Sequence, residues 1–327
     1  MCRLRADVTE ICSLPAIQLE NEHLVLSILP EPGAKIYDLF WKASGQQILW
    51  QNPRIKPQRY PIDSNFDNYW CGGWDEGFPT CDACQYNGES YPNLGELRSV
   101  AWHVEKIETQ GSSAVAELSA FGPISPAHVL KRVTLQGTSV SVRYQLANIG
   151  PLPFEFIWGS HPALAVTSDT VLHIPAKAGI VALSSSPALG SPGQRYNWPH
   201  IETPEGNVDM SRVQRVSAGV FCGHYALELH AGVYGVQFGG TGLALVVRFP
   251  VEQCPCLWMW LVYGGWRGYH HAIIEPWTSY PVNLAEAVKN GTHRSLAPGQ
   301  TFCTEISVTV YSDLEEWRRE MRRITAA

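Results

Sequence analysis

The chain has 327 residues, 45% of them hydrophobic and 17% charged, which is enough to bury the core of one large domain or two ordinary ones. A net charge of −6 gives no electrostatic basis for binding nucleic acid or an anionic membrane. No apolar run is long enough to cross a bilayer, and residues 1–7 lack the apolar core of a signal peptide, so we expect a cytoplasmic protein.

The nine cysteines are an odd number in a chain without an export signal, which predicts reduced thiols. Cys81 and Cys84 form a CxxC pair, and Cys254 and Cys256 form a CxC pair. Together these pairs could make a four-thiolate zinc site. Pro255 splits the second pair inside an apolar run, and free cysteines usually behave as small buried hydrophobic residues. We therefore predict that the chain holds no metal.

Short extended segments, separated by turns rich in glycine and proline, account for most of the chain. Apolar and polar residues alternate in them, or short apolar runs stand between turns, and both patterns are typical of strands. Two pairs of these segments are joined by the short turns expected of hairpins. In chain order, the predicted strands are residues 23–29, 36–41, 104–108, 114–121, 129–135, 140–146, 219–229, 232–238, 243–249, 272–274 and 302–311.

One segment near the C-terminus has a helical pattern. Apolar residues recur at helical spacing from Leu314 to Ile324, and Ser312 or Asp313 can cap the first turn. Many short strands without alternating helices predict an all-β fold. We expect a large antiparallel sandwich with a short C-terminal helix, formed as a single domain over residues 1–327.

An acidic residue follows one of the most apolar strands directly. Glu275 would be costly to bury there unless it is paired, hydrogen-bonded or protonated. Pro276 should end the strand at this point, because proline lacks an amide proton and disfavours helix in the residue before it. With Trp277 as a wall, Glu275 could be a pocket carboxylate with a tuned pKa. The alternative is a structural ion pair with Arg248 or Arg267.

Three other stretches also break the alternating pattern. His161 follows the apolar run 156–158 and precedes Pro162, which repeats the arrangement around the acidic residue. Residues 68–79 contain aromatic, acidic and glycine residues and predict a shaped loop rather than a strand. Residues 91–98 form the third stretch. The candidate binding side chains in the last two stretches are Trp74, Asp75, Glu76 and Arg98.

These residue types suit acid–base chemistry on a polyhydroxylated ligand. His161 and Glu275 could act as general acid and base, while aromatic rings stack on the apolar faces of the ligand. A glycoside hydrolase that uses Asp75 or Glu76 with Glu275 remains open. The chain has no GxSxG, HExxH or dinucleotide-binding motif, so Ser160 beside His161 gives little support for a serine hydrolase.

Several motifs occur in a fixed order along nearly the whole chain. They are LPEPGAKI at 29–36, GGWDE at 72–76 with FP at 78–79, GELR at 95–98, SHP at 160–162, LWMW at 257–260 with GG at 264–265, and IEPWT at 274–278. Each motif alone is a weak signal. Their order and spacing together resemble the aldose 1-epimerase (galactose mutarotase-like) superfamily, and more narrowly a bacterial aldose epimerase-type subgroup.

The resemblance implies a large antiparallel β-supersandwich that interconverts the α and β anomers of a free sugar. It implies that Glu275 is the base for the anomeric hydroxyl and that His161 is the acid that protonates the ring oxygen. Two proton-transfer groups require no cofactor. We expect a small carbohydrate as the partner of a monomer or homodimer. The sugar-binding candidates are Trp74, Asp75, Glu76, Arg98, Arg248, Trp260 and Trp277.

One position departs from the family pattern. Many relatives carry a histidine just before the glycine that matches Gly95, whereas this chain has Leu94. Leucine cannot donate a hydrogen bond, which keeps open a non-catalytic sugar-binding protein on the same scaffold. A hexose-phosphate epimerase is a second alternative, and it would need a basic pocket for the phosphate. The arginines that could form such a pocket are Arg59, Arg98, Arg248 and Arg267.

Overall fold

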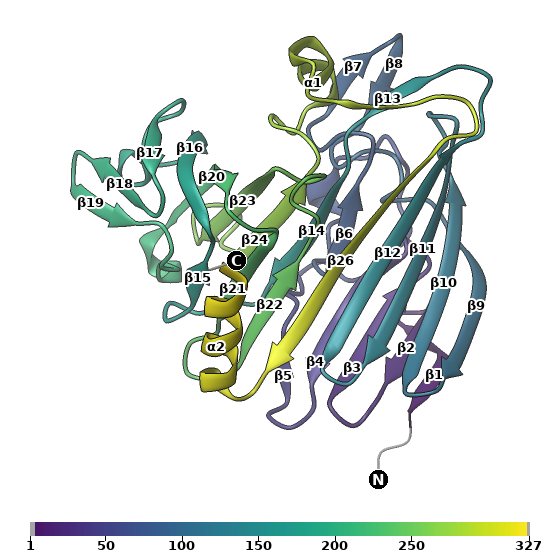
Figure 1. The fold of residues 1–327 in the computed structure, drawn as a ribbon, viewed down its shortest axis with the longest axis horizontal. Helices are drawn as coiled ribbons and strands as arrows, with labels where there is room; N and C mark the ends of the chain where they lie inside the picture. The colour runs from purple at the N-terminus through teal and green to yellow at the C-terminus, as the bar shows by residue number, and fades with distance from the viewer. Residues whose placement is uncertain (1–3, 326–327) are drawn as a thin grey trace. The chain divides into compact units, whose positions relative to one another are not determined.

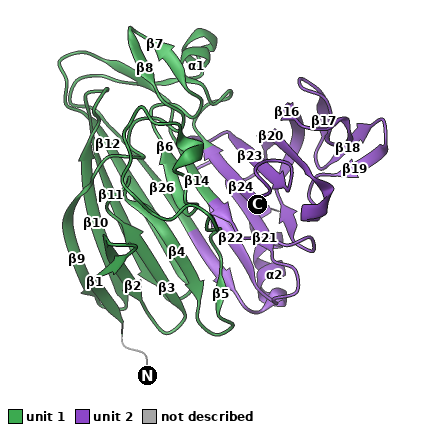
Figure 2. Cartoon of the chain, turned by 180° about the vertical axis from the view of Figure 1, so that it is seen from behind, with its two compact units in different colours: residues 1–162, 277–307 green, residues 163–276, 308–327 purple. Residues whose placement is uncertain are grey.

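The computed structural model describes residues 4–325, which divide into two compact units (Figure 2). Unit 1 comprises residues up to Pro162 together with Trp277–Ser307, and unit 2 comprises Ala163–Pro276 and the chain from Val308 onward. The boundaries fall inside three strands, β14 (Gly159–Leu164), β24 (His270–Trp277) and β26 (Thr301–Tyr311). The expectation of a single domain over residues 1–327 stays a prediction.

Unit 1 contains two large sheets (Figure 1). In the first sheet, β1 to β4 are followed by β6 and β14, and β5 pairs with β4; in the second, the order is β26-β12-β11-β10-β9. The strands are β1 (Arg5–Ile11), β2 (Leu14–Glu20), β3 (Leu24–Leu29), β4 (Lys35–Trp41), β5 (Gln46–Gln47), β6 (Trp74–Gly77), β9 (His103–Gln110), β10 (Ser113–Phe121), β11 (Ala127–Gln136) and β12 (Ser139–Asn148). Two small ladders pair β7 (Cys84–Tyr86) with β8 (Glu89–Tyr91) and β13 (Phe154–Phe156) with β25 (Arg294–Leu296).

Alternation along β11 and β12 explains how unit 1 forms its core. In β11, every second residue from Ala127 to Leu135 is buried, and β12 repeats this from Val140 to Asn148. The residues between them are partly or fully exposed, because successive side chains of a strand point to opposite faces. The predicted hairpins are confirmed, since β9 pairs with β10 and β11 pairs with β12 in antiparallel register.

Unit 2 holds a second group of strands. One run follows the order β24-β23-β20-β16-β17-β18-β19, and another follows β15-β21-β22. The strands are β15 (Val171–His173), β16 (Ala176–Ser184), β17 (Arg195–Asn197), β18 (His200–Thr203), β19 (Gly206–Asp209), β20 (Val220–Leu229), β21 (Val233–Gln237), β22 (Ala244–Arg248) and β23 (Cys256–Tyr263). With the sheets of unit 1, they confirm the predicted all-β sandwich class.

The C-terminal helix α2 (Leu314–Thr325) is where the periodicity predicts it. Asp313 caps it, because the Asp313 Oδ1 atom accepts hydrogen bonds from the backbone N–H groups of Glu315 and Glu316. Trp317 and Met321 pack on β21 and β22, which explains the apolar stripe. A second helix, α1 (Leu284–Asn290), was not predicted, although Asn283 caps its first turn and Gly291 ends it in the left-handed conformation.

Three expectations about local structure were wrong. Pro276 does not end β24, and β14 runs through His161 and Pro162. Residues 74–77 form the strand β6 rather than a loop. A proline removes a single donor and otherwise fits an extended backbone, so pairing can resume beyond it. Pairing resumes at Thr278, whose N–H donates to the carbonyl of Trp158 at 2.9 Å.

Candidate active site

The pairing of β6 with β14 brings two predicted site residues together in unit 1. His161 lies directly opposite Asp75 in the antiparallel register, and Ser160 lies opposite Glu76. Directly paired residues project from the same face of a sheet, while neighbours in sequence project from opposite faces. His161 and Asp75 therefore share one face of the sheet, and Glu76 points to the other.

A lysine that sequence reasoning missed neutralises Asp75. The Lys35 ammonium forms an ion pair with Asp75 Oδ2 and donates to the Gly72 carbonyl at 2.9 Å. Both charged side chains are almost fully buried. Burial disfavours the ammonium, but the attraction of Asp75 and nearby groups leaves the pKa of Lys35 above its ordinary value. Asp75 Oδ1 is buried and has no hydrogen-bond partner, so this oxygen is a vacant acceptor.

His161 lies in an aromatic enclosure beside this ion pair. The rings of Phe66 and Trp70 meet its imidazole edge-on, with centroid separations of 6.2 and 5.7 Å. Burial is the main cause that lowers the pKa of His161; Asp75 partly opposes it, Lys35 adds to it, and the resulting pKa is about 4. The imidazole is therefore neutral at physiological pH.

Glu76 lies in a separate polar cluster on the opposite face of β6. Its Oε2 atom accepts hydrogen bonds from the Lys131 ammonium at 2.8 Å and from the Tyr144 hydroxyl at 3.0 Å. The same ammonium donates to the Ala34 carbonyl at 2.8 Å. Burial raises the pKa of Glu76, and Lys131 opposes that shift. This cluster connects the two sheets of unit 1, because Lys131 belongs to β11 and Glu76 to β6.

Two of the predicted aromatic residues are deeply buried in unit 1. The indole N–H of Trp74 donates to the Ser160 hydroxyl at 2.7 Å. Trp277 lies against the backbone of two glycines, where a Cβ on Gly77 or Gly159 would come within 2.2 Å of the indole ring. Both tryptophans are at most 1% exposed, so they pack in the core beneath the candidate site.

Arg98 is buried among carbonyl groups of unit 1. Its guanidinium donates to the carbonyls of Asn93, Ile62 and Ser64, and it lies 5.3 Å from the ring centroids of both Tyr60 and Phe66. Its Nη1 atom has no hydrogen-bond partner. Arg98 therefore holds two loop segments in place, one at residues 62–64 and one at Asn93, and keeps one donor vacant.

Glu275 lies in unit 2, in the strand β24, and is 1% exposed. Among the described residues of unit 2, no other Asp, Glu, Lys or Arg is buried. The negative charge of Glu275 adds to the effect of burial in raising the pKa of Tyr234, whose hydroxyl donates to the Ile274 carbonyl at 3.0 Å. Glu275 is thus the one buried carboxylate among the described residues of unit 2.

The two other predicted residues of unit 2 are less buried. Arg248, considered above as an ion-pair partner for Glu275, pairs with Glu320 of α2. Trp260 is half-buried in β23, with the ring of Phe221 at 5.3 Å and that of Trp266 at 5.9 Å. Whether any of the predicted binding residues contacts a sugar stays a prediction.

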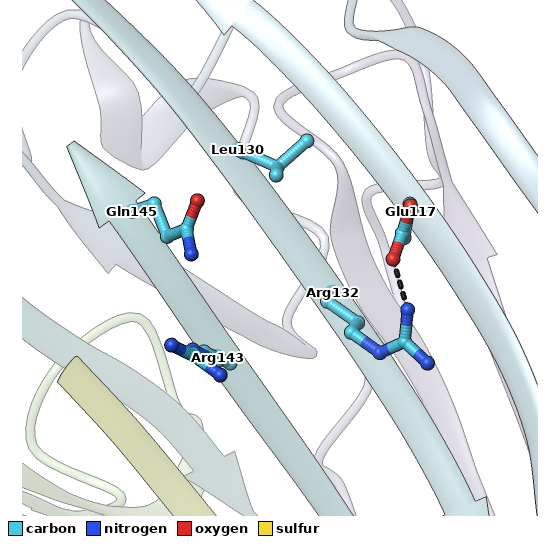
Figure 3. Close-up of a pocket in the computed structure, with 5 residues that line it drawn as sticks. All are labelled: Glu117, Leu130, Arg132, Arg143 and Gln145. Atoms are coloured by element: carbon cyan, nitrogen blue, oxygen red, sulfur yellow. Dashed lines mark hydrogen bonds and ion pairs between the residues drawn. The ribbon is translucent and has the colours of Figure 1, made fainter. Parts of the chain in front are cut away.

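A surface hollow of about 260 Å³ lies elsewhere in unit 1 (Figure 3). Arg132 forms an ion pair with Glu117 there, and Leu130 extends from the same strand as Arg132. These positions of β11 alternate with the inward row that contains Lys131. The hollow is therefore on the outer face of its sheet and is separate from the Glu76 cluster. It is lined by Glu117, Leu130, Arg132, Arg143 and Gln145.

Two other features are absent from the described residues. Within residues 4–325, no group of three or more His, Cys, Asp or Glu side chains is arranged to hold a metal ion. None of the helices in this described part is long and apolar enough to span a membrane.

The sequence contained a signal for one of the two missed lysines. Lys131 has the same parity as Val129 and Val133 in a strand that alternates strictly, so it had to face the core. Lys35 begins β4 after a turn, where no alternation distinguishes a buried ammonium from an exposed one. Both lysines became recognisable only with their acidic partners.

Comparisons with known proteins place the fold. No protein-family model matches the sequence, and no curated protein matches it. A proposed aldose 1-epimerase from Klebsiella pneumoniae superposes with a TM-score of 0.75 at 12% identity, over 96% of this chain and 84% of that one. A protein from Synechocystis sp. PCC 6803 gives 0.69 at 19% identity, over 96% and 100% of the two chains. A galactose mutarotase-like protein from Clostridium acetobutylicum gives 0.65 at 15% identity, over 94% and 98%. At these identities the likeness establishes a shared fold.

Proposed function

Because the chain has the fold of the aldose 1-epimerase (galactose mutarotase-like) superfamily, we propose that it interconverts the α and β anomers of a free sugar. Glu275 is the general base and His161 is the general acid. The observation that carries the proposal is the burial of Glu275, the one buried Asp, Glu, Lys or Arg among the described residues of unit 2. Carboxylates are seldom fully buried, and those that are often belong to functional sites.

The proposed reaction conserves protons and electrons. Glu275 takes the proton of the anomeric hydroxyl, the electron pair of that O–H bond forms the carbonyl at C1, and the bond from C1 to the ring oxygen breaks. The ring oxygen takes a proton from His161. Rotation about the C1–C2 bond presents the other face of the carbonyl, and the same two groups reverse their roles when the ring closes.

The low pKa of His161 determines which form of the enzyme is active. At pH 7, a group with a pKa of about 4 is protonated in roughly one molecule in a thousand. The imidazolium that forms is a strong acid and transfers its proton readily, but it is scarce. We therefore expect the enzymatic rate of anomer exchange to rise as the pH falls from 7 to 5, once the buffer-catalysed rate has been subtracted.

Exchange NMR of a panel of free aldoses, with and without the protein, tests the proposal. Glu275→Gln and His161→Ala should each return the exchange rate to the buffer value while the circular dichroism spectrum stays unchanged. Glu117→Gln, which alters a half-buried carboxylate on the outer face of unit 1, serves as the matched control and should keep the wild-type rate. Wild-type activity in either site variant would contradict the proposed roles.

A non-catalytic sugar-binding protein is the second candidate, and Leu94 favours it. Leu94 is 1% exposed and has a φ of 59°, a conformation that is uncommon for a residue other than glycine. It fills the position where the resemblance implies a sugar-binding histidine. In this case the protein would broaden the NMR lines of a sugar while leaving its anomer exchange at the buffer rate. Adding sugar phosphates to the same panel separates the hexose-phosphate alternative.

A further inference from the structure

Half-buried aromatic rings gather on one part of unit 2. Phe221, Trp260 and Trp266 form a continuous row, here called the aromatic platform, with centroid separations of 5.3 and 5.9 Å. All three rings remain partly exposed. The structural tryptophans of the protein behave differently, since Trp74, Trp158, Trp277 and Trp317 are each less than 3% exposed.

The backbone beneath the platform is arranged to admit large rings. Tyr225, which lies opposite Trp258 in the register of β20 and β23, contacts its ring at 4.6 Å. Gly223 lies between Phe221 and Tyr225 on the same face of β20, and a Cβ there would come within 2.3 Å of the Trp258 ring. Because Gly223 has no side chain, the Trp258 indole fits beneath the platform.

Glu275 belongs to the same face as this platform. The hairpin of β23 and β24 is closed by a 2.8 Å hydrogen bond from the Gly264 N–H to the Tyr269 carbonyl. Along β24, His271 and Glu275 are four residues apart and therefore project to one side. The His271 ring lies 6.4 Å from that of Trp266. The platform consequently extends along the sheet on the side from which Glu275 projects.

The distance between His271 and Glu275 along β24 determines how many sugar rings could reach from Glu275 to the platform. Four residues of extended chain span about 13 Å, which exceeds the length of one pyranose ring. A sugar whose anomeric carbon is at Glu275 would end before it reaches Trp266, whereas a second ring would lie over the platform. The Arg267 guanidinium lies 5.1 Å from the centroid of the Trp266 ring, which puts a positive charge beside the platform.

We infer that Phe221, Trp260 and Trp266 form a subsite for the second ring of a reducing disaccharide or oligosaccharide. Aromatic faces stack on the C–H faces of pyranoses, and the favourable term is the burial of apolar surface. The inference rests on the proposed function for the role of Glu275, and it adds a substrate class: a sugar with a free anomeric centre and at least one further ring.

Anomer exchange of cellobiose and of glucose, compared in one protein preparation, tests the subsite. The wild-type kcat/KM should favour cellobiose, and Trp266→Ala should reduce the ratio of the two values on the order of tenfold, the loss expected for one stacked ring. Trp266→Leu keeps apolar volume but removes the ring, so it replaces Trp266→Ala if that variant does not fold. Trp198→Ala removes another half-buried tryptophan of unit 2 and should leave the ratio unchanged.

Saturation-transfer NMR with methyl β-cellobioside separates the subsite from the reaction, because this glycoside has no free anomeric hydroxyl. Saturation of its second ring that disappears in Trp266→Leu supports the subsite even if no sugar exchanges faster than in buffer, which would defeat the proposed function alone. Equal acceleration of glucose and cellobiose without such saturation would overturn the subsite and leave the function standing. A matching loss of the ratio in Trp198→Ala would also overturn it.

Discussion

The two units bury different kinds of side chain. Unit 1 buries the charged residues Lys35, Asp75, Glu76, Glu96, Arg98 and Lys131, whereas the described part of unit 2 buries Glu275 alone among such residues. Unit 2 instead buries neutral imidazole and aromatic rings, as in the 2.9 Å hydrogen bond between the Tyr196 hydroxyl and His224 Nδ1. Unit 1 therefore depends on the geometry of its ion pairs, and unit 2 depends on apolar packing.

This difference gives the proposed acid and the proposed base different surroundings. A buried ion pair holds its members at a fixed place, but it is costly to disrupt because the remaining charge has no solvent. In the described part of unit 2, Glu275 is the one buried residue among Asp, Glu, Lys and Arg. The proposed acid thus lies within an electrostatic framework, and the proposed base lies within an apolar one.

The largest expected effect comes from breaking an ion pair of unit 1. Lys131→Met should destabilise the protein by about 3–5 kcal/mol, because it strands the Glu76 carboxylate in the core. Urea unfolding measures this. The double variant Lys131→Met with Glu76→Gln should recover much of the loss. Arg132→Met, one residue along on the exposed face, should cost less than about 1 kcal/mol, and a similar cost for both single variants would contradict the comparison.

Acid should weaken both units through their buried histidines. Burial lowers the pKa of His161 and of His224 to about 4, below the value of 6.5 expected in the unfolded chain. Each neutral histidine therefore contributes stability that is complete above pH 6.5 and is lost as the pH falls through 4, about 3 kcal/mol per residue. Unfolding at pH 7.0 and 4.5 should show this loss, and His161→Asn or His224→Asn should each flatten it. A wild type whose stability is unchanged over this range would refute the expectation.

Glycines beneath tryptophans allow a test of packing in each unit. Gly159→Ala drives a methyl group into Trp277, which is fully enclosed, so we expect a loss of about 3 kcal/mol. Gly223→Ala meets Trp258, which is 8% exposed and can move outward, so about 1 kcal/mol is expected. Thermal unfolding of both variants provides the ranking, and the reverse order would show that unit 2 is the more tightly packed.

The smallest measured change is a shift in the titration of one histidine, in a variant that also loses stability because Asp75 loses its lysine. Lys35→Met removes a positive charge that lowers the pKa of His161, so the pKa of His161 should rise while that of His224 stays constant. Imidazole NMR signals followed from pH 3 to 8 report both residues in one experiment. If both histidines shift together, the cause is a general loosening rather than the charge of Lys35.

Sequence reasoning predicted the strands and α2 well, because alternation and capping are local signals. It failed where local and tertiary preferences diverged. Residues 74–77 have two glycines before them and adjacent acids, which favour a loop, yet their pairing with β14 makes them a strand. Helix α1 has only seven residues, too few for an apolar period to show.

The candidate site was predictable only in part for a similar reason. His161 and Glu275 could be singled out because each interrupts an apolar run before a proline. The lysine partners of Asp75 and Glu76 could not be singled out in this way. Lys35 is 40 residues from Asp75 in sequence, and Lys131 is 55 residues from Glu76. Pairing over such distances is determined by the sheet register, which the sequence does not reveal locally.

The adjacent acids of β6 also help to fix the register of this strand with its neighbours. Asp75 and Glu76 point to opposite faces, and each meets a lysine from a different strand. If β6 slipped by one residue during folding, every side chain would change faces, and one of the two ammonium groups would be left without a carboxylate in the core. A chain with β6 out of register is therefore less stable than the native fold. An inserted residue should be tolerated in the loop before β6 but not within β6.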